Sequence, residues 1–331
     1  MRLLTFELPT SLGPVQRIGA LTPVNEIVDL TLANRLKLMD GGMTESAAIR
    51  ISEAETPPDM IAFIEGGGRA LESGCDALDW AQRTRQIDGY KFLHLPGEVS
   101  IRSPIPRPPV LRDFMAFETH LQNIYPKLGR TIPPEWYNLP VYYKGNPGSV
   151  GADGEDIRIP VYATELDYEF ELAIVIARGG TDIKPANAMD HIYGYMIYND
   201  LSAREIQQRE MSVGLGPAKG KDFHRAHVLG PYLVTADEIS DPYNLDLRAY
   251  INGEECCSTN TSTIHWSFED MIAHASKEET LVAGEVFGTG TVGGGSGTET
   301  GRLLSAGDVI ELKAEKLGVL SNRIIKQEGT T

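Results

Sequence analysis

Several side chains that could act together follow one apolar segment of the chain. Residues 192–198 read IYGYMIY, an apolar and aromatic run typical of a strand, and Asp200 follows it. We expect Asp200 to cap a helix on which Arg204 and Gln207, at positions i+4 and i+7, share its face. Lys221 comes after a glycine-rich turn. This layout predicts a site where a carboxylate, a guanidinium, an amide and an ammonium meet. The alternative is a helix cap with a surface Asp–Arg pair.

A second candidate strand carries acidic side chains on one face. Apolar and acidic residues alternate over residues 165–174, which places Glu165, Asp167, Glu169 and Glu171 together on the face opposite the apolar one. Like charges on one strand face repel each other unless water or a cation separates them. Small apolar residues continue the acidic face after Glu171, so the strand is expected to enter the interior, where Glu169 and Glu171 would be costly to leave unpaired. A solvated edge is the alternative, and we favour a metal.

Asp113 and His120 extend this candidate site. We expect Asp113 to cap a helix on which His120 lies two turns further along the same face. The spacing is weak evidence alone, but it adds a fourth carboxylate and a general base. Oxygen donors without a neighbouring His or Cys ligand indicate a hard cation, Mg²⁺, Mn²⁺ or Ca²⁺, and not zinc. The four candidate metal ligands are Asp113, Glu169, Glu171 and Asp200.

The bulk composition is that of a globular protein, with 331 residues, 41% of them hydrophobic and 23% charged. The net charge of −16 argues against a nucleic acid or an anionic membrane as partner, since both need a basic surface. The cysteines, Cys75, Cys256 and Cys257, form no CxxC pattern and indicate a reducing compartment. The N-terminus lacks a signal-peptide pattern, and no apolar run approaches the about 18 residues of a membrane span. We therefore expect a soluble, cytoplasmic protein.

The elements that would position these residues fall on two sides of a proline-rich stretch. Residues 101–109 contain four prolines and predict a stiff connector. We expect a small N-terminal α+β domain, residues 1–104, with strands near 3–6, 15–21 and 26–30 and helices near 34–39, 58–65 and 70–83. Strand-like runs separated by Gly, Pro and Asp/Asn turns dominate residues 105–331, the expected catalytic domain. The fold class is α+β, mostly β, with mixed or antiparallel sheets.

Taken in order, the motifs of the chain resemble those of the fumarylacetoacetate hydrolase family. The resemblance covers residues 105–325 and, more loosely, the N-terminal region. Each motif is weak alone, and the ordered set is specific. The motifs are Arg112-Asp113-Phe114 with His120, Leu139-Pro140-Val141-Tyr142-Tyr143-Lys144-Gly145, Leu166-Asp167-Tyr168-Glu169-Phe170-Glu171, Asn199-Asp200-Leu201-Ser202-Ala203-Arg204 with Gln207, Gly220-Lys221, and Gly288-Thr289-Gly290-Thr291.

The resemblance implies a mixed β-sandwich roll, usually assembled as a homodimer, and a divalent cation, most often Mg²⁺, on the four carboxylates. It implies His120 as the general base and three groups around a developing oxyanion. These three are Arg204, Gln207 and Lys221. The implied substrate contacts are Tyr143, Arg130 and Thr291.

Two further positions carry open interpretations. Arg225 stands where similar members have a threonine, so it could bind a substrate carboxylate or form a surface ion pair. Glu299, in the glycine-rich segment, is a candidate acid partner of His120 or a surface residue. In one branch of the family the acid follows the histidine by three residues, but Asn123 occupies that position here.

The leading hypothesis for function is a metal-dependent hydrolase that cleaves a C–C bond of an acylpyruvate-like or fumarylacetoacetate-like diketo acid, in aromatic-compound or sugar-acid catabolism. Water activated by His120 would attack a carbonyl of the metal-bound substrate. Without that attack, the same enolate leads to decarboxylation, hydration or isomerisation, so a lyase or isomerase is the alternative. A cation-binding β-protein without catalysis is a third interpretation, which His120 and Lys221 disfavour because cation storage does not need them. A serine hydrolase is disfavoured because no G-x-S-x-G motif occurs.

Overall fold

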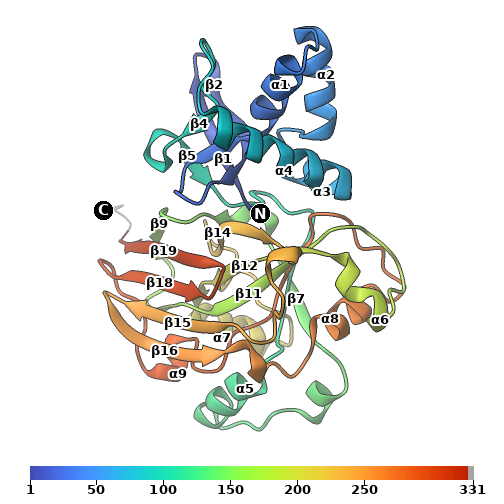
Figure 1. The fold of residues 1–331 in the computed structure, drawn as a ribbon. Coiled ribbons are helices and arrows are strands. Elements are labelled where there is room, and N and C mark those ends of the chain that lie inside the picture. Colours follow the sequence, from blue (N-terminus) through green and yellow to red (C-terminus); the bar gives the residue numbers. More distant parts are fainter. Residues whose placement is uncertain (327–331) are drawn as a thin grey trace.

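The computed structural model describes residues 1–326 and is built on one large mixed sheet (Figure 1). Its main path contains β11, β12 and β14, which pair antiparallel, while β17 and β6 pair parallel. The sheet has 12 strands, with β5 (Ser100–Arg102) beside β1 and β8 (Val150–Gly151) beside β14. The other strands, in spatial order, are β4 (Leu93–His94), β3 (Ile27–Asp29), β2 (Gly13–Leu21), β1 (Arg2–Thr10), β14 (His227–Thr235), β12 (Ile192–Asp200), β11 (Phe170–Ile176), β17 (Val286–Gly288), β6 (Leu111–Phe114) and β7 (Tyr142–Gly145).

A second sheet of five strands lies against the large one (Figure 1). Its strands, in spatial order, are β16 (Glu254–Asn260), β15 (Asp246–Ile251), β18 (Val309–Ala314), β19 (Gly318–Ile325) and β9 (Asp156–Arg158). A small ladder joins β10 (Leu166–Asp167) to β13 (Ser202–Ala203). The main core fills the space between the two sheets and includes Leu172 and Ile174 from one and Leu247 and Leu312 from the other. The fold is thus α+β with large mixed sheets, as the sequence predicts.

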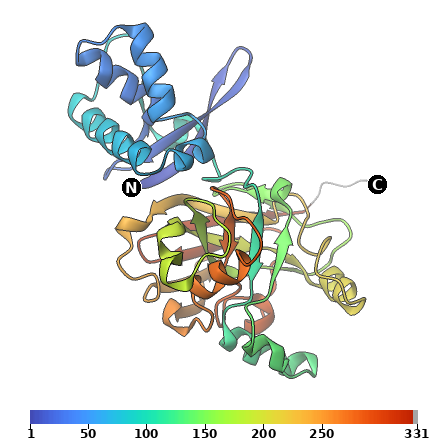
Figure 2. The same ribbon diagram turned by 90° about the vertical axis from the view of Figure 1, so that its right-hand side faces the viewer.

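The N-terminal region packs its helices over the other face of the large sheet and forms the smaller lobe in Figure 2. The expected strands form β1 to β3, and β1 pairs with β14, so the N-terminal strands continue the large sheet. The expected helices form α1, α3 and α4, whereas α2 was not predicted. The boundary between residues 104 and 105 stays a prediction. The helices of the region are α1 (Leu30–Asp40), α2 (Glu45–Glu55), α3 (Met60–Glu65) and α4 (Gly67–Thr84).

The remaining α-helices are short and belong to the larger lobe (Figure 1). They are α5 (Glu118–Ile124), α6 (Pro185–Ala188), α7 (Arg204–Ser212), α8 (Phe268–Ala275) and α9 (Gly297–Thr300). Among residues 1–326, no helix is both long and apolar enough to cross a membrane.

Two predicted helix caps are wrong. Asp200 is the last residue of β12, and α7 begins only at Arg204, after β13. Asp113 lies inside β6, and α5 begins at Glu118. Strand pairing outweighs the local capping preference, because Asp113 pairs with Gly288 of β17 and with Tyr143 of β7 in the ladder.

The apolar face predicted over residues 165–174 is confirmed, since its five side chains all belong to the main core. The expected continuous strand is divided, however. β10 ends at Asp167 and pairs with β13, while β11 begins at Phe170 and pairs with β12 and β17. Glu169 lies at the division, where its backbone forms a bridge to Ser296.

Candidate active site

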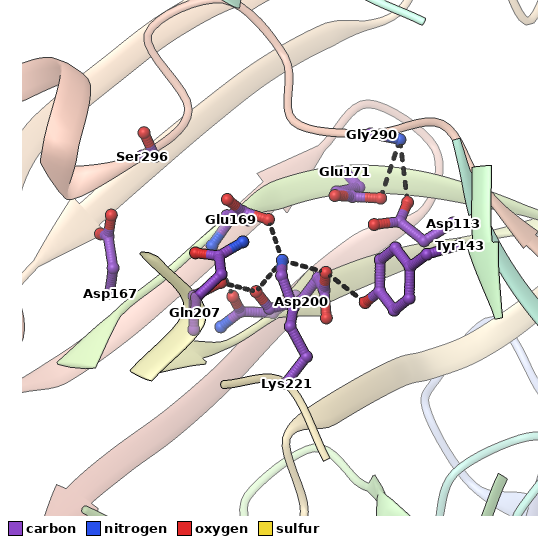
Figure 3. Close-up of polar contacts among 12 residues, drawn as sticks. Asp113, Tyr143, Asp167, Glu169, Glu171, Asp200, Gln207, Lys221, Gly290 and Ser296 are labelled. Atoms are coloured by element: carbon purple, nitrogen blue, oxygen red, sulfur yellow. Dashed lines mark hydrogen bonds and ion pairs between the residues drawn. The ribbon is translucent and has the colours of Figure 1, made fainter. Parts of the chain in front are cut away.

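Four buried carboxylates meet at one end of the large sheet (Figure 3). Each offers an oxygen atom, and these atoms all lie within 4.8 Å of one another. β6 supplies Asp113, β11 supplies Glu171, β12 supplies Asp200, and Glu169 directly precedes β11. The four side chains are those that the sequence predicts as metal ligands, and no residue among them is more than 6% exposed.

Two cations of the protein contact only part of this acid cluster. The Lys221 ammonium contacts both Glu169 and Asp200. Arg204 Nη1 lies 2.7 Å from Glu169 Oε1, and Arg204 Nε donates to Asp167 Oδ2 over 2.8 Å. Arg204 also donates from Nη1 to Gln207 Oε1 over 2.9 Å, so the first turn of α7 faces the cluster. Arg204, Gln207 and Lys221 therefore lie where the sequence places them, although Asp200 is not on their helix.

The pKa values of the four carboxyls differ because Lys221 and Arg204 contact only two of them, Glu169 and Asp200. Burial opposes ionisation of Glu169 and Asp200, but Lys221, together with Arg204 at Glu169 and His227 at Asp200, outweighs it and holds the pKa of both carboxyls below their usual values. Burial raises the pKa of Asp113 and Glu171 well above their usual values, and nearby carboxylates raise it further. The backbone N–H of Gly290 donates to Asp113 Oδ1 over 3.2 Å and to Glu171 Oε2 over 2.9 Å.

The residues present fit a divalent cation. Glu171 Oε1 is buried and has no hydrogen-bond partner within residues 1–326, which is an expensive arrangement for a carboxylate oxygen. A donor set made only of carboxylate oxygens is the one that hard cations prefer. Asp113, Glu169, Glu171 and Asp200 could thus hold such an ion.

His120 lies near the cluster with an acid partner of its own. His120 Nδ1 is 2.8 Å from Glu299 Oε2, and Asn123 Nδ2 donates to Glu299 Oε1 over 2.9 Å. The Glu299 carboxylate also accepts from Gly294 N over 2.8 Å and from Ser296 Oγ over 3.0 Å. The candidate acid partner is therefore Glu299, and the residue is not a surface one, since its side chain is only 2% exposed. These bonds hold the glycine-rich segment against α5.

The other predicted contacts divide into residues at the cluster and residues away from it. Tyr143 donates from its hydroxyl to Asp200 Oδ2 over 2.7 Å. Thr291 is buried in the glycine-rich segment, next to Gly290. Arg130 is exposed in the segment after α5. Arg225 Nη2 lies 3.1 Å from Glu155 Oε1, so its guanidinium forms the ion pair that is the second interpretation of this residue.

Sequence reasoning missed one residue that contacts the cluster. His227 is fully buried, with Nδ1 3.0 Å from Asp200 Oδ1. Burial alone would lower its pKa, but hydrogen bonds to Asp200 and Asp222 outweigh burial and raise the pKa. The signal that could have found it is the pairing of β12 with β14, in which Asp200 and His227 are partners. That register cannot be read from either strand alone.

Comparison with known proteins identifies the family. The model of the fumarylacetoacetate (FAA) hydrolase C-terminal domain matches residues 109–325. This chain belongs to the fumarylacetoacetate hydrolase family. Over 329 residues it is 33% identical to the mitochondrial oxaloacetate tautomerase fahd2 of Xenopus laevis, covering 98% of this chain and 90% of the relative. It is 34% identical over 329 residues to the human mitochondrial oxaloacetate tautomerase FAHD2A, covering 98% of each chain.

Solved structures of the family share the fold over nearly the whole chain. The fumarylacetoacetate hydrolase of Exiguobacterium antarcticum matches with a TM-score of 0.70 and 22% identity, covering 99% of this chain and 100% of that one. The maleylpyruvate hydrolase of Sphingobium sp. SYK-6, solved with manganese(II) and pyruvate, matches with a TM-score of 0.68 and 21% identity, covering 99% and 100%. This chain is thus an enzyme of the fumarylacetoacetate hydrolase superfamily with a buried acidic cluster that could hold a divalent cation.

Proposed function

We propose that this enzyme interconverts the enol and keto forms of a 2-oxo dicarboxylic acid of the oxaloacetate type. The observation that carries the proposal is the buried four-carboxylate cluster with a His–Glu pair near it. The relatives named as oxaloacetate tautomerases, matched over 98% of this chain, favour isomerisation over the C–C hydrolysis that the sequence alone suggested. The isomerase alternative is therefore the better interpretation.

We assign the cation to Asp113, Glu169, Glu171 and Asp200, with Mg²⁺ first and Mn²⁺ or Ca²⁺ as alternatives. The maleylpyruvate hydrolase structure, solved in complex with manganese(II) and pyruvate, supports a divalent cation and a 2-oxo acid as ligands of this fold. When bound, a divalent cation would hold paired substrate oxygens and stabilise the negative charge of an enolate. A homodimer and a cytoplasmic location stay predictions.

His120 is suited to move the proton that tautomerisation requires. The Glu299 carboxylate accepts the hydrogen bond from Nδ1, so a neutral imidazole carries its lone pair on Nε2. Nε2 would take a proton from the substrate carbon or return one to it, with the enol oxygen as the other site of exchange. No water molecule needs to be activated, and no C–C bond breaks.

The cationic residues are placed to stabilise the negative charge that develops on the substrate oxygen in the same reaction. The Lys221 ammonium, held between Glu169 and Asp200, provides a fixed positive charge for an oxyanion that develops beside the cluster. Arg204 fixes Glu169 from the other side and fixes Gln207 through its Nη1. Tyr143 is proposed as a substrate contact, since its hydroxyl already reaches Asp200.

The experiment that tests the proposal follows both forms of one substrate. Enol oxaloacetate is mixed with the protein and Mg²⁺ or Mn²⁺, loss of enol absorbance is recorded, and products are identified by NMR. We expect faster ketonisation with no pyruvate, CO₂ or C–C cleavage product, and its loss with a chelator. Cleavage of an acylpyruvate panel without faster ketonisation would establish the hydrolase instead.

Replacement of His120 tests its role within that assay. His120→Ala should lower kcat by ~10²–10⁴, the usual contribution of a positioned general base. Mg²⁺ affinity measured by calorimetry should be retained, because His120 is not assigned as a ligand. His224→Ala is the matched control, since His224 is exposed and should leave turnover unchanged. Near-full turnover by His120→Ala would remove the histidine from the mechanism.

A further inference from the structure

His227 is the first residue of β14, is fully buried, and contacts Asp200 of the acid cluster. Its ring lies between two carboxylates: Nδ1 is 3.0 Å from Asp200 Oδ1, and Nε2 is 3.5 Å from Asp222 Oδ1. The Tyr198 hydroxyl lies 2.7 Å from the same Nδ1. A Cβ added to Gly145 would lie 3.1 Å from the ring, so the glycine gives the imidazole its space.

The hydrogen bond to Asp200 defines where the proton of His227 must lie. A carboxylate only accepts hydrogen bonds, so the 3.0 Å contact is a hydrogen bond when Nδ1 carries hydrogen, and the Tyr198 hydroxyl then also accepts at this N–H. The other oxygen of Asp200, Oδ2, accepts from Tyr143 and contacts Lys221. The two Asp200 oxygens therefore have different partners, and His227 is the one that contacts Oδ1.

His227 also connects Asp200 to the segment that carries Lys221. Asp222, the residue next to Lys221, lies near Nε2 and accepts from the backbone N–H of Asn146 over 3.1 Å. Asn146 directly follows β7, the strand of Tyr143. One imidazole thus contacts the candidate ligand Asp200 and the residue beside the cluster's lysine.

We propose that His227 is a positioning residue for the metal site, whose Nδ1–H fixes Asp200 Oδ1 and keeps Oδ2 turned toward Lys221 and the cation. This inference rests on the proposed assignment of Asp200 as a ligand. Hydrogen bonds to metal ligands from residues behind them typically contribute ~10–100-fold to metal affinity. The competing explanation is that His227 only fills the space beside Gly145 and stabilises the fold.

Two amide variants separate these explanations. The amide nitrogen of His227→Asn takes the place of Nδ1 and can still donate to Asp200. The amide nitrogen of His227→Gln takes the place of Nε2 and faces Asp222 instead. Both remove the ring, so a purely space-filling role predicts equal effects, whereas the positioning role predicts rescue by the asparagine only.

The measurement is the affinity of the metal-free protein for Mn²⁺, by electron paramagnetic resonance, for wild type and both variants. We expect His227→Asn to bind nearly as tightly as wild type and His227→Gln to bind ~10–100-fold more weakly. Equal affinities of the two variants would overturn the positioning role while leaving the cation site intact. Failure of the wild type to bind Mn²⁺ would overturn the cation site itself, and this inference with it.

A measurement on the wild type covers the case in which a variant does not fold. Nitrogen NMR of histidine-labelled protein reports which ring nitrogen of His227 carries hydrogen. We expect a protonated Nδ1 with a strongly deshielded N–H proton, both without metal and with Mg²⁺. An Nδ1 without hydrogen would overturn the inference, because that nitrogen could not donate to Asp200.

Discussion

The acid cluster has two halves that compensate their negative charge in different ways. In the half formed by Glu169 and Asp200, the Lys221 ammonium contacts both carboxylates, and Arg204 adds a second cation at Glu169. The pKa values of both acids stay low although burial opposes it, so this half is ionised. Its charges are paired entirely by residues of the chain.

Within residues 1–326, the half formed by Asp113 and Glu171 has no such cation. Its donor is the backbone N–H of Gly290, shared between the two carboxylates. Burial raises the pKa of both acids, Asp200 raises it further for each of them, and Glu171 Oε1 has no hydrogen-bond partner among residues 1–326. A bound divalent cation would compensate negative charge mainly in this half. The half formed by Glu169 and Asp200 is compensated by Lys221 and Arg204 even when no ion is bound. Metal-free stability should therefore respond differently to substitutions in the two halves, although both halves supply ligands to the cation.

The largest effect on stability is expected in the half formed by Glu169 and Asp200, which Lys221 contacts. Lys221→Met should lower the free energy of unfolding of the metal-free protein by about 3–5 kcal/mol, because it removes the ammonium that contacts two buried carboxylates, Glu169 and Asp200. Urea unfolding in the presence of a chelator measures this loss.

Lys144→Met is the matched control for that loss. Lys144 pairs with Glu279, but the two side chains are 55% and 40% exposed, so the effect should be at most ~1 kcal/mol. Equal losses of unfolding free energy in the two variants would mean that Lys221 is not needed to compensate the negative charge of the cluster.

The next prediction exchanges one ligand in each half. Asp200→Asn and Glu171→Gln should each weaken Mg²⁺ binding at least about tenfold, since even indirect changes around a metal cost that much. Metal-free stability should diverge: Asp200→Asn removes a partner of Lys221 and destabilises, whereas Glu171→Gln removes a repelled carboxylate and does not. Calorimetric titration and chelator-treated unfolding give the two quantities. A similar loss of metal-free stability in both variants would contradict the division into halves.

The difference between the halves also explains what the sequence could predict. Glu169 and Glu171 were found from the alternation of one strand, because a period of two is a local property of the chain. Asp113 and Asp200 were predicted as site residues correctly, although both lie in strands and not at helix N-termini. The order of the motifs along the chain identifies an acid whichever element carries it. Composition and strand-rich patterning were sufficient for the fold class.

The residues that sequence reasoning left open depend on long-range register. Glu299 lies 179 residues from His120 in the chain, and its contact exists only because the glycine-rich segment packs on α5. His227 meets Asp200 through the pairing of β12 with β14, which neither strand specifies alone. Helix α2 carries only two buried residues, Ala48 and Ser52, so its apolar stripe is weak in the sequence.

The smallest effect is expected from a cation outside both halves. Arg225→Lys should leave KM unchanged, because the guanidinium is paired with Glu155 and donates to the Asp156 carbonyl over 3.4 Å. Arg225 has a left-handed backbone with φ of 62°, and its Cβ lies against Gly151 and not against the cluster. Stability should change by at most ~1 kcal/mol, as for other partly exposed ion pairs, since Arg102 also holds Glu155.

Arg204→Lys is the matched control for Arg225→Lys, because lysine cannot bridge Asp167 and Glu169 as the planar guanidinium does. We expect steady-state kinetics on oxaloacetate to change for Arg204→Lys and not for Arg225→Lys. A raised KM in Arg225→Lys alone would show that a third cation binds the substrate carboxylate. A carboxylate of the substrate would then be paired with Arg225, outside the acid cluster. The two halves of the cluster would not be sufficient to explain substrate binding.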